Sequence, residues 1–151
     1  MLGHSLLSAD SVEFLRALPY ADTKTLCGKR IYIAHYSMNA ANQCVMYTPD
    51  PTLQDLRHMF AGIDADIILY GHDHKPSIQH DDKQWFINCG SLGCPAQEHN
   101  IARAGLLHLS ESSVSFAPVQ ISYDADQVVS LIRSLRYPDH KNILKYFYGI
   151  Q

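Results

Sequence analysis

The chain has 151 residues, of which 46% are hydrophobic and 18% are charged, and this composition is typical of one globular domain over residues 1–151. The net charge of −3 and the lack of a basic run do not indicate a nucleic acid as a partner, and no apolar stretch approaches the length of a membrane span. Residues 1–20 lack the basic start and apolar core of a signal peptide, so we expect a cytoplasmic protein.

The first half of the chain is expected to alternate helices with buried strands. A capping-box pattern predicts a helix over residues 10–18, and a stretch that alternates and then runs apolar predicts a buried strand over 29–36. Apolar residues at helical spacing behind a threonine predict a helix over 52–61. The apolar run 65–70 then predicts a second buried strand.

The second half is expected to be richer in strands. Residues 77–88 read as two strands around an Asp-Asp-Lys turn, and 102–110 and 113–122 read as another pair. An amphipathic pattern predicts a helix over 124–135, and the tail 142–150 predicts a last helical turn or two. These elements indicate α/β layers in which helices pack over a sheet.

Three histidines follow the two buried strands of the first half. His35 ends the first of these strands, and His72 and His74 follow the second in the stretch LYGHDHKPS. Ligand sites of open α/β sheets gather beyond the carboxyl ends of the strands, so we expect the three imidazoles at one edge. In an extended chain His72 and His74 point the same way, with Asp73 pointing away, and they would share one metal ion or serve two.

The other histidines and the cysteines are expected to carry no chemistry. Six histidines are interpreted as surface or packing residues: His4, His58, His80, His99, His108 and His140. The four cysteines form no C-x-x-C pair and are expected to be free thiols. A zinc site built on Cys89 and Cys94 is the alternative.

Three segments together resemble the calcineurin-like metallophosphoesterases, and in particular their small bacterial and archaeal phosphodiesterase-like members. YGHDHKP is similar to the Gly-His-Thr-His-x-Pro motif of that family, IAHYS lies where the family has a strand ending in His-Gly, and INCGSLGCP resembles its Asn-Pro-Gly-Ser loop. The motifs occur in the order of the family. The resemblance implies a four-layer αββα sandwich, of which this chain would lack the N-terminal part.

The resemblance also implies a reaction and a set of site residues. Members hydrolyse phosphomonoesters or phosphodiesters with metal-activated hydroxide at two divalent ions, which are Mn, Fe, Zn, Ni or Co. His35 and His72 would ligate one ion and His74 the other. Asn88, Gly90 and Ser91 would line the substrate side, although Asn88 and Ser91 are equally interpreted as supports of their loop.

The sequence departs from the family pattern in ways that bear on function. Its Asp-x-His, Gly-Asp and Gly-Asn-His elements are not found, and Tyr36 and Cys89 replace a glycine and a proline. We therefore expect the C-terminal portion of a phosphoesterase domain, completed by a separate N-terminal half or by self-association. The alternatives are a catalytically inactive binding module, a role that a retromer subunit has with this fold, and a fragment without a role of its own.

Overall fold

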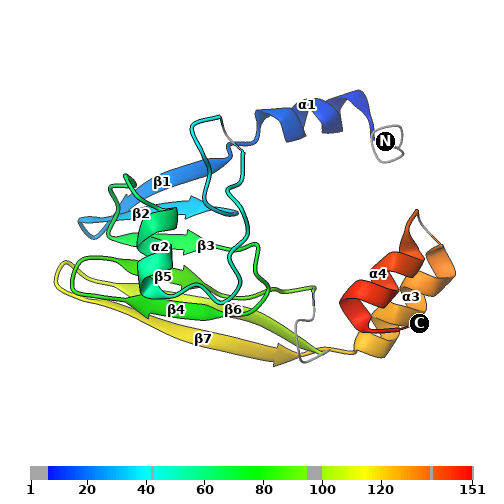
Figure 1. The fold of residues 1–151 in the computed structure, drawn as a ribbon. Coiled ribbons are helices and arrows are strands. Elements are labelled where there is room, and N and C mark those ends of the chain that lie inside the picture. The colour runs from blue at the N-terminus through cyan, green and yellow to red at the C-terminus, as the bar shows by residue number, and fades with distance from the viewer. Residues whose placement is uncertain (1–6, 42, 95–99, 137, 151) are drawn as a thin grey trace.

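The computed structural model describes residues 7–41, 43–94, 100–136 and 138–150. In these residues a five-stranded sheet, a two-stranded sheet and helices form the fold shown in Figure 1. The bounds of the elements in chain order are α1 Ala9–Ala17, β1 Ala21–Leu26, β2 Lys29–Ala34, α2 Leu53–Met59, β3 Ile67–Tyr70, β4 Ser77–His80, β5 Trp85–Asn88, β6 Ile101–Leu109, β7 Val114–Ser122, α3 Ala125–Leu135 and α4 His140–Tyr148.

The five-stranded sheet has the order β1-β2-β3-β5-β4. Its three central strands, β2, β3 and β5, run parallel, and β1 and β4 are antiparallel strands at the two edges. Ile67 and Ile68 are adjacent in β3 and both fully buried, which explains the continuous apolar run, because a central parallel strand is covered on both faces. The carboxyl ends of the parallel strands therefore meet at one edge.

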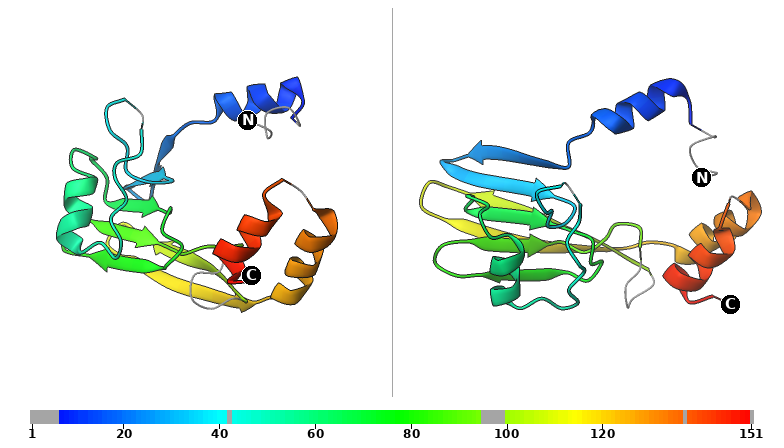
Figure 2. Two further views of the ribbon diagram at one scale, coloured as in Figure 1. Left: turned by 45° about the vertical axis from the view of Figure 1, so that its right-hand side comes forward. Right: turned by 45° about the horizontal axis from the view of Figure 1, so that its top comes forward.

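Different layers cover the two faces of this sheet. On one face α2 packs Leu56 and Phe60 against Ile68 and Phe86. On the other face the β6–β7 hairpin packs around Ile31, Ile67 and Ile87 with its side chains Leu107, Leu109, Val114 and Phe116. Figures 1 and 2 show α2 and the hairpin on opposite sides of the sheet. This arrangement confirms the predicted mixed α/β fold, in which helices and a second sheet cover a central sheet.

The remaining helices lie beyond the strands. α1 buries none of its residues and extends from the start of β1, and α3 and α4 pack on each other around Val129, Ile132 and Leu144. Figure 2 shows the α3–α4 pair on the side of the sheet toward which the parallel strands run. None of the helices in the described ranges combines the length and apolarity needed to cross a bilayer.

Two elements differ from the expectations. β1 was not predicted because its sequence, ADTKTL, is polar and mostly exposed, and it becomes a strand by pairing with β2 along its whole length. The tail forms the full helix α4, which begins at His140 and therefore exceeds one or two turns. Its apolar residues pack on α3, and tertiary packing of this kind stabilises helices that are too short to persist alone.

Candidate metal centre

His35 and His72 meet at the carboxyl edge of the sheet. The register pairs Ile33 in β2 with Leu69 in β3, so the chain positions that follow lie side by side, and the Gly71 N–H donates to the His35 carbonyl at 2.9 Å. The imidazole atoms His35 Nε2 and His72 Nδ1 are 3.2 Å apart, and the ring planes are nearly perpendicular at 88°. The structure therefore brings together two of the three predicted histidines.

The separation of the two nitrogens fits two ligands of one metal ion. Ligand nitrogens at about 2.0–2.1 Å from an ion, with an angle of about 90–110° between them, lie about 2.9–3.4 Å apart. The 3.2 Å separation falls in this range. The pair supplies two donors, and nowhere in the described ranges do three or more His, Cys, Asp or Glu side chains form a group that could hold a metal.

The backbone at His72 explains why His74 is not the third donor of that pair. His72 has a φ of 72°, in the left-handed region, which non-glycine residues seldom adopt and which occurs at functional sites. The prediction for His72 and His74 assumed an extended chain, and this conformation interrupts it. As a result, Asp73 does not point away from the two histidines but lines the same pocket with them. The His74 ring lies 6.3 Å from the ring of Phe147 in α4.

Two tyrosines enclose the His72 ring. Tyr36, which stands where the family has glycine, is 1% exposed and belongs to the core beside α2. Its hydroxyl accepts a hydrogen bond from the Thr48 N–H at 3.0 Å, and its ring centroid is 4.8 Å from that of His72. Tyr47 lies 5.5 Å from the same ring, and burial, followed by the charge of Asp73, raises the pKa of its phenol. These contacts hold the His72 ring in place.

Asn88 and Gly90 hold the histidine loop against the end of β5. Asn88 is 1% exposed, and its side-chain amide donates to the Asp73 carbonyl at 2.6 Å while its Oδ1 accepts from the Gly90 N–H at 2.9 Å. Gly90 has a φ of 87°, and a Cβ atom there would lie 3.1 Å from the His74 carbonyl. The INCGS segment therefore fixes the backbone of the loop that carries His72 and His74.

Ser91, Cys89 and Cys94 contribute no metal ligand in this structure. The Ser91 hydroxyl accepts the backbone N–H groups of Gly93 and Cys94 at 3.3 and 2.9 Å, which closes a turn in its own loop. Burial raises the pKa of the Cys89 and Cys94 thiols, and a protonated thiol is a poor metal ligand. The two sulfurs belong to no metal-binding group within the described residues.

The site opens into a hollow that we call the histidine pocket. It is broadly open to solvent, has a volume of about 430 Å³ and is lined by Tyr47, His72, Asp73, His74, Cys94, Tyr146 and Phe147. Tyr47 and the two aromatic residues of α4 were not predicted as site residues. Nothing in their local sequence distinguishes them from core or surface aromatics, and only the fold brings them to the histidines.

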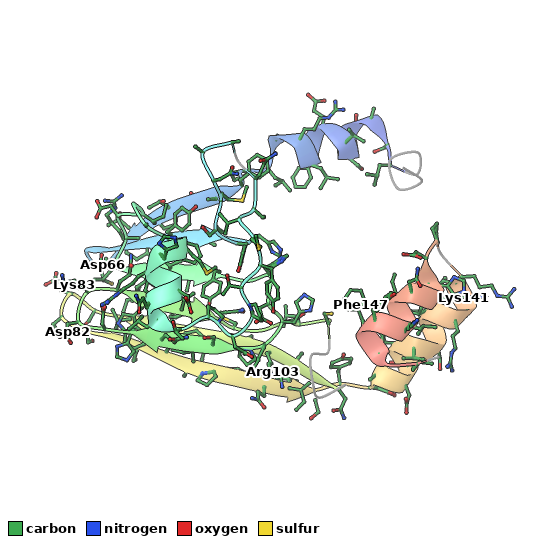
Figure 3. All side chains as sticks on the ribbon, in the orientation of Figure 1. Asp66, Asp82, Lys83, Arg103, Lys141 and Phe147 are labelled. Carbon is green, nitrogen blue, oxygen red and sulfur yellow. The ribbon has the colours of Figure 1, made fainter. Side chains whose placement is uncertain are left out.

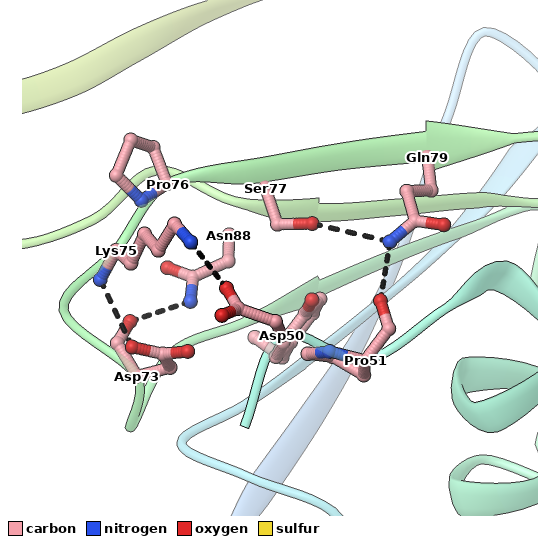
Figure 4. A pocket seen from close by; sticks show the side chains of 9 residues that line it. Asp50, Pro51, Asp73, Lys75, Pro76, Ser77, Gln79 and Asn88 are labelled. Atoms are coloured by element: carbon pink, nitrogen blue, oxygen red, sulfur yellow. Dashed lines mark hydrogen bonds and ion pairs between the residues drawn. The ribbon is translucent and has the colours of Figure 1, made fainter. Parts of the chain in front are cut away.

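A second hollow, the polar pocket, shares Asp73 with the histidine pocket. It encloses about 190 Å³ and is shown in Figure 4 with its lining residues Asp50, Pro51, Tyr70, Asp73, Lys75, Pro76, Ser77, Gln79 and Asn88. Lys75 forms an ion pair with Asp50, and the Gln79 amide donates to the Pro51 carbonyl. The Asp50 carboxylate is thus paired with an ammonium group.

A layered α/β domain with paired imidazoles beyond its parallel strands has the architecture of a metallophosphoesterase. Residues 7–112 match the calcineurin-like phosphoesterase superfamily domain, and the chain belongs to that family, as its motifs predicted. No curated protein matches the chain.

Solved structures agree with this fold. A hypothetical protein from Pyrococcus horikoshii OT3 superposes with a TM-score of 0.72 at 18% identity, over 94% of this chain and 56% of that protein. A metallophosphoesterase from Sphaerobacter thermophilus gives 0.65 at 16% identity, over 89% and 61%. Wild-type Vps29 from Entamoeba histolytica, complexed with zinc, gives 0.50 at 16% identity, over 79% and 78%. The chain thus spans 56% and 61% of the length of the first two proteins.

Proposed function

We propose that this chain carries the metal-binding edge of a phosphoesterase that hydrolyses a phosphomonoester or phosphodiester. In this proposal His35 and His72 hold one divalent ion and His74 contributes to a second. The observation that supports it best is the 3.2 Å separation of the His35 and His72 ring nitrogens at the carboxyl edge of the sheet. A divalent ion bound there would polarise a phosphoryl oxygen and lower the pKa of water.

The residues around the histidines have positioning roles in this proposal. Tyr36 and Tyr47 orient the His72 ring, since both rings pack against it. Asn88 and Gly90 fix the loop backbone and act through His72 and His74. Ser91 shapes the adjoining loop, where its backbone and that of Gly90 border the substrate side. Manganese, iron, zinc, nickel and cobalt all suit imidazole donors.

Metal retention tests the proposal directly. The chain is equilibrated with zinc or manganese, freed of excess metal by dialysis, and its metal content is measured together with hydrolysis of a bis-aryl phosphodiester. We expect His72→Ala and His35→Ala to lose the metal that the native chain retains, and to lose turnover when the chain is assayed together with its N-terminal half. His108→Ala is the matched control, because it also removes an imidazole. His108 is exposed on β6, away from the carboxyl edge of the five-stranded sheet. Unchanged metal content in His72→Ala would refute the assignment of that ligand.

The second candidate is a binding module with the same fold and no catalysis. It is favoured by one observation, which is that no three-ligand group is found in the part of the chain that the structure describes. This candidate predicts that the native chain retains no metal above the level of His72→Ala and does not hydrolyse the diester. Metal retention above that level, with turnover, contradicts it.

We further propose that another polypeptide, either a separate N-terminal half or a second copy, covers α1. The helix and the residues that follow it expose Phe14, Leu15, Leu18 and Tyr20. Contiguous apolar side chains of this kind mark interaction surfaces. Sedimentation of the chain should give a concentration-dependent mass that Phe14→Ser reduces, and a concentration-independent monomer would exclude self-association.

A further inference from the structure

The histidine pocket is bounded on two sides by groups of different chemistry. The strand-end loops contribute the imidazoles of His72 and His74, and α4 contributes the rings of Tyr146 and Phe147. Figure 3 shows Phe147 on the side of α4 that faces the strand ends. Its ring centroid is 6.3 Å from that of His74, with the planes inclined at 47°. The aromatic rings of α4 and the histidines thus share one hollow.

The packing of α3 on α4 does not account for these two aromatic residues. The buried centre of the pair is formed by Val129, Ile132 and Leu144. The partly buried side chains around it are Val128, Ile143, Tyr148 and Ile150, which leaves Tyr146 and Phe147 outside. Tyr146 is 72% exposed. Large aromatic side chains that do not stabilise their own helix pair are available to a ligand.

The charge of the pocket restricts what it would bind. Among the described residues that line it there is one carboxylate, Asp73, and no lysine or arginine, and the Lys145 ammonium lies over the Tyr146 ring at 5.5 Å from its centroid. The divalent ions of the proposed function would bind the phosphate of either ester, but a doubly charged phosphomonoester also takes its strongest hydrogen bonds from guanidinium or ammonium groups, which do not line this pocket. A singly charged phosphodiester with a planar apolar group requires less cationic charge and adds stacking contacts with aromatic side chains. The volume of about 430 Å³ is within the range of small-ligand sites.

We propose that Tyr146 and Phe147 form an aromatic subsite that binds the planar group of a phosphodiester, while its phosphate lies toward His72 and His74. This inference rests on the proposed function and adds the substrate class to it. The planar group is an aryl ring or a nucleobase, which share the same stacking chemistry. The subsite selects substrates through α4, an element outside the matched family segment, residues 7–112.

Binding to metal-free protein tests the subsite without any turnover. Dissociation constants for dimethyl phosphate, methyl phenyl phosphate and the methyl ester of adenosine 5′-phosphate are measured by NMR titration in the presence of a chelator. We expect a planar ester to bind about tenfold more tightly than dimethyl phosphate, as two aromatic contacts permit. The tighter of the two planar esters identifies the source of the group.

Variants of α3 and α4 test whether Tyr146 and Phe147 cause the preference for planar esters over dimethyl phosphate. Phe147→Leu retains an apolar side chain without a ring. We expect it to reduce the preference for a planar ester to about threefold or less, and we expect the double variant with Tyr146→Leu to reduce this preference further. Leu131→Ala is the matched control, because Leu131 is an exposed apolar residue of α3 outside the pocket. A cooperative thermal transition in each variant shows that it is folded.

The outcomes separate this inference from the proposed function. Equal binding of all three esters by the native chain, or an unchanged preference in Phe147→Leu, overturns the subsite even if His35 and His72 retain metal. A preference that Phe147→Leu abolishes supports the subsite, and it does so even in a chain that retains no metal.

Discussion

Replacement of Gly90 by alanine should destabilise the protein more than the same change at two other glycines. Gly90 has a φ of 87°, and an alanine in such a conformation costs about 1–2 kcal/mol. The new Cβ would also lie 3.1 Å from the His74 carbonyl and 2.9 Å from the Arg103 Cδ. The Arg103 side chain can move, but the His74 carbonyl belongs to the loop that Asn88 holds in place. Overpacking of this kind costs about 1–3 kcal/mol of stability.

The sum for Gly90→Ala is therefore about 2–5 kcal/mol. For a chain of this size that lowers Tm by roughly 5–15 °C. Gly62→Ala is the first control, because Gly62 has a φ of 85° but nothing within 4 Å of the new Cβ, so only the conformational cost of about 1–2 kcal/mol remains. Gly93→Ala is the second control, since it has neither a positive φ nor a close neighbour.

Urea and thermal unfolding, followed by circular dichroism, compare the three variants. The expected order of destabilisation is Gly90→Ala, then Gly62→Ala, then Gly93→Ala. Equal effects at Gly90 and Gly62 would show that the His74 carbonyl does not resist the new methyl group. Equal effects at all three positions would refute the whole argument, including the view that Gly90 fixes the histidine loop.

Three further predictions concern other parts of the chain. Asn88→Ala removes two hydrogen bonds from a buried site and should lower the free energy of unfolding, measured in urea, by about 2–4 kcal/mol. A decrease below about 1 kcal/mol would contradict the view that Asn88 holds the histidine loop. Asp124→Ala removes the side-chain cap of α3 and should lower the free energy of unfolding by about 0.5–2 kcal/mol. Asp126→Ala is the control, because Asp126 lies in the same turn but is not the cap, and its effect must be smaller. The Thr52 hydroxyl and N–H lower the pKa of the Asp55 carboxyl below 3.8, so its contribution to the stability of α2 is complete above that pH and is lost as the pH falls through the lowered pKa. Thermal melts across the acid range should therefore show a weaker pH dependence in Asp55→Asn, and an unchanged dependence would argue against the capping box.

The chain sequence is sufficient to predict two buried strands and the edge at which they end. A stretch at 29–36 that alternates and then runs apolar, and an apolar run at 65–70, predict buried strands, and the structure shows them as the neighbouring parallel strands β2 and β3. Because parallel strands that are neighbours end at the same edge, His35 and His72 were expected together, and their ring nitrogens lie 3.2 Å apart. This prediction depends only on local patterns and on a general property of sheets.

Other features depend on contacts between segments that are distant in the sequence. The left-handed conformation of His72, which places Asp73 in the pocket, cannot be read from an H-x-H spacing, because that spacing has the expected meaning only in an extended chain. β1 has no apolar signal and forms through its hydrogen bonds to β2. The aromatic residues of α4 reach the histidines only because α3 and α4 lie beyond the strand ends.

By itself the sequence determined the family, the layered fold and the pair of histidines, since hydrophobic periodicity and short motifs are local properties. The tertiary structure decided how the histidine loop is held and what faces it. Asn88 donates to a carbonyl 15 positions earlier in the chain, and Phe147 approaches a ring that lies 73 positions earlier. Contacts of that kind follow from the packing of whole elements, and no local pattern encodes them.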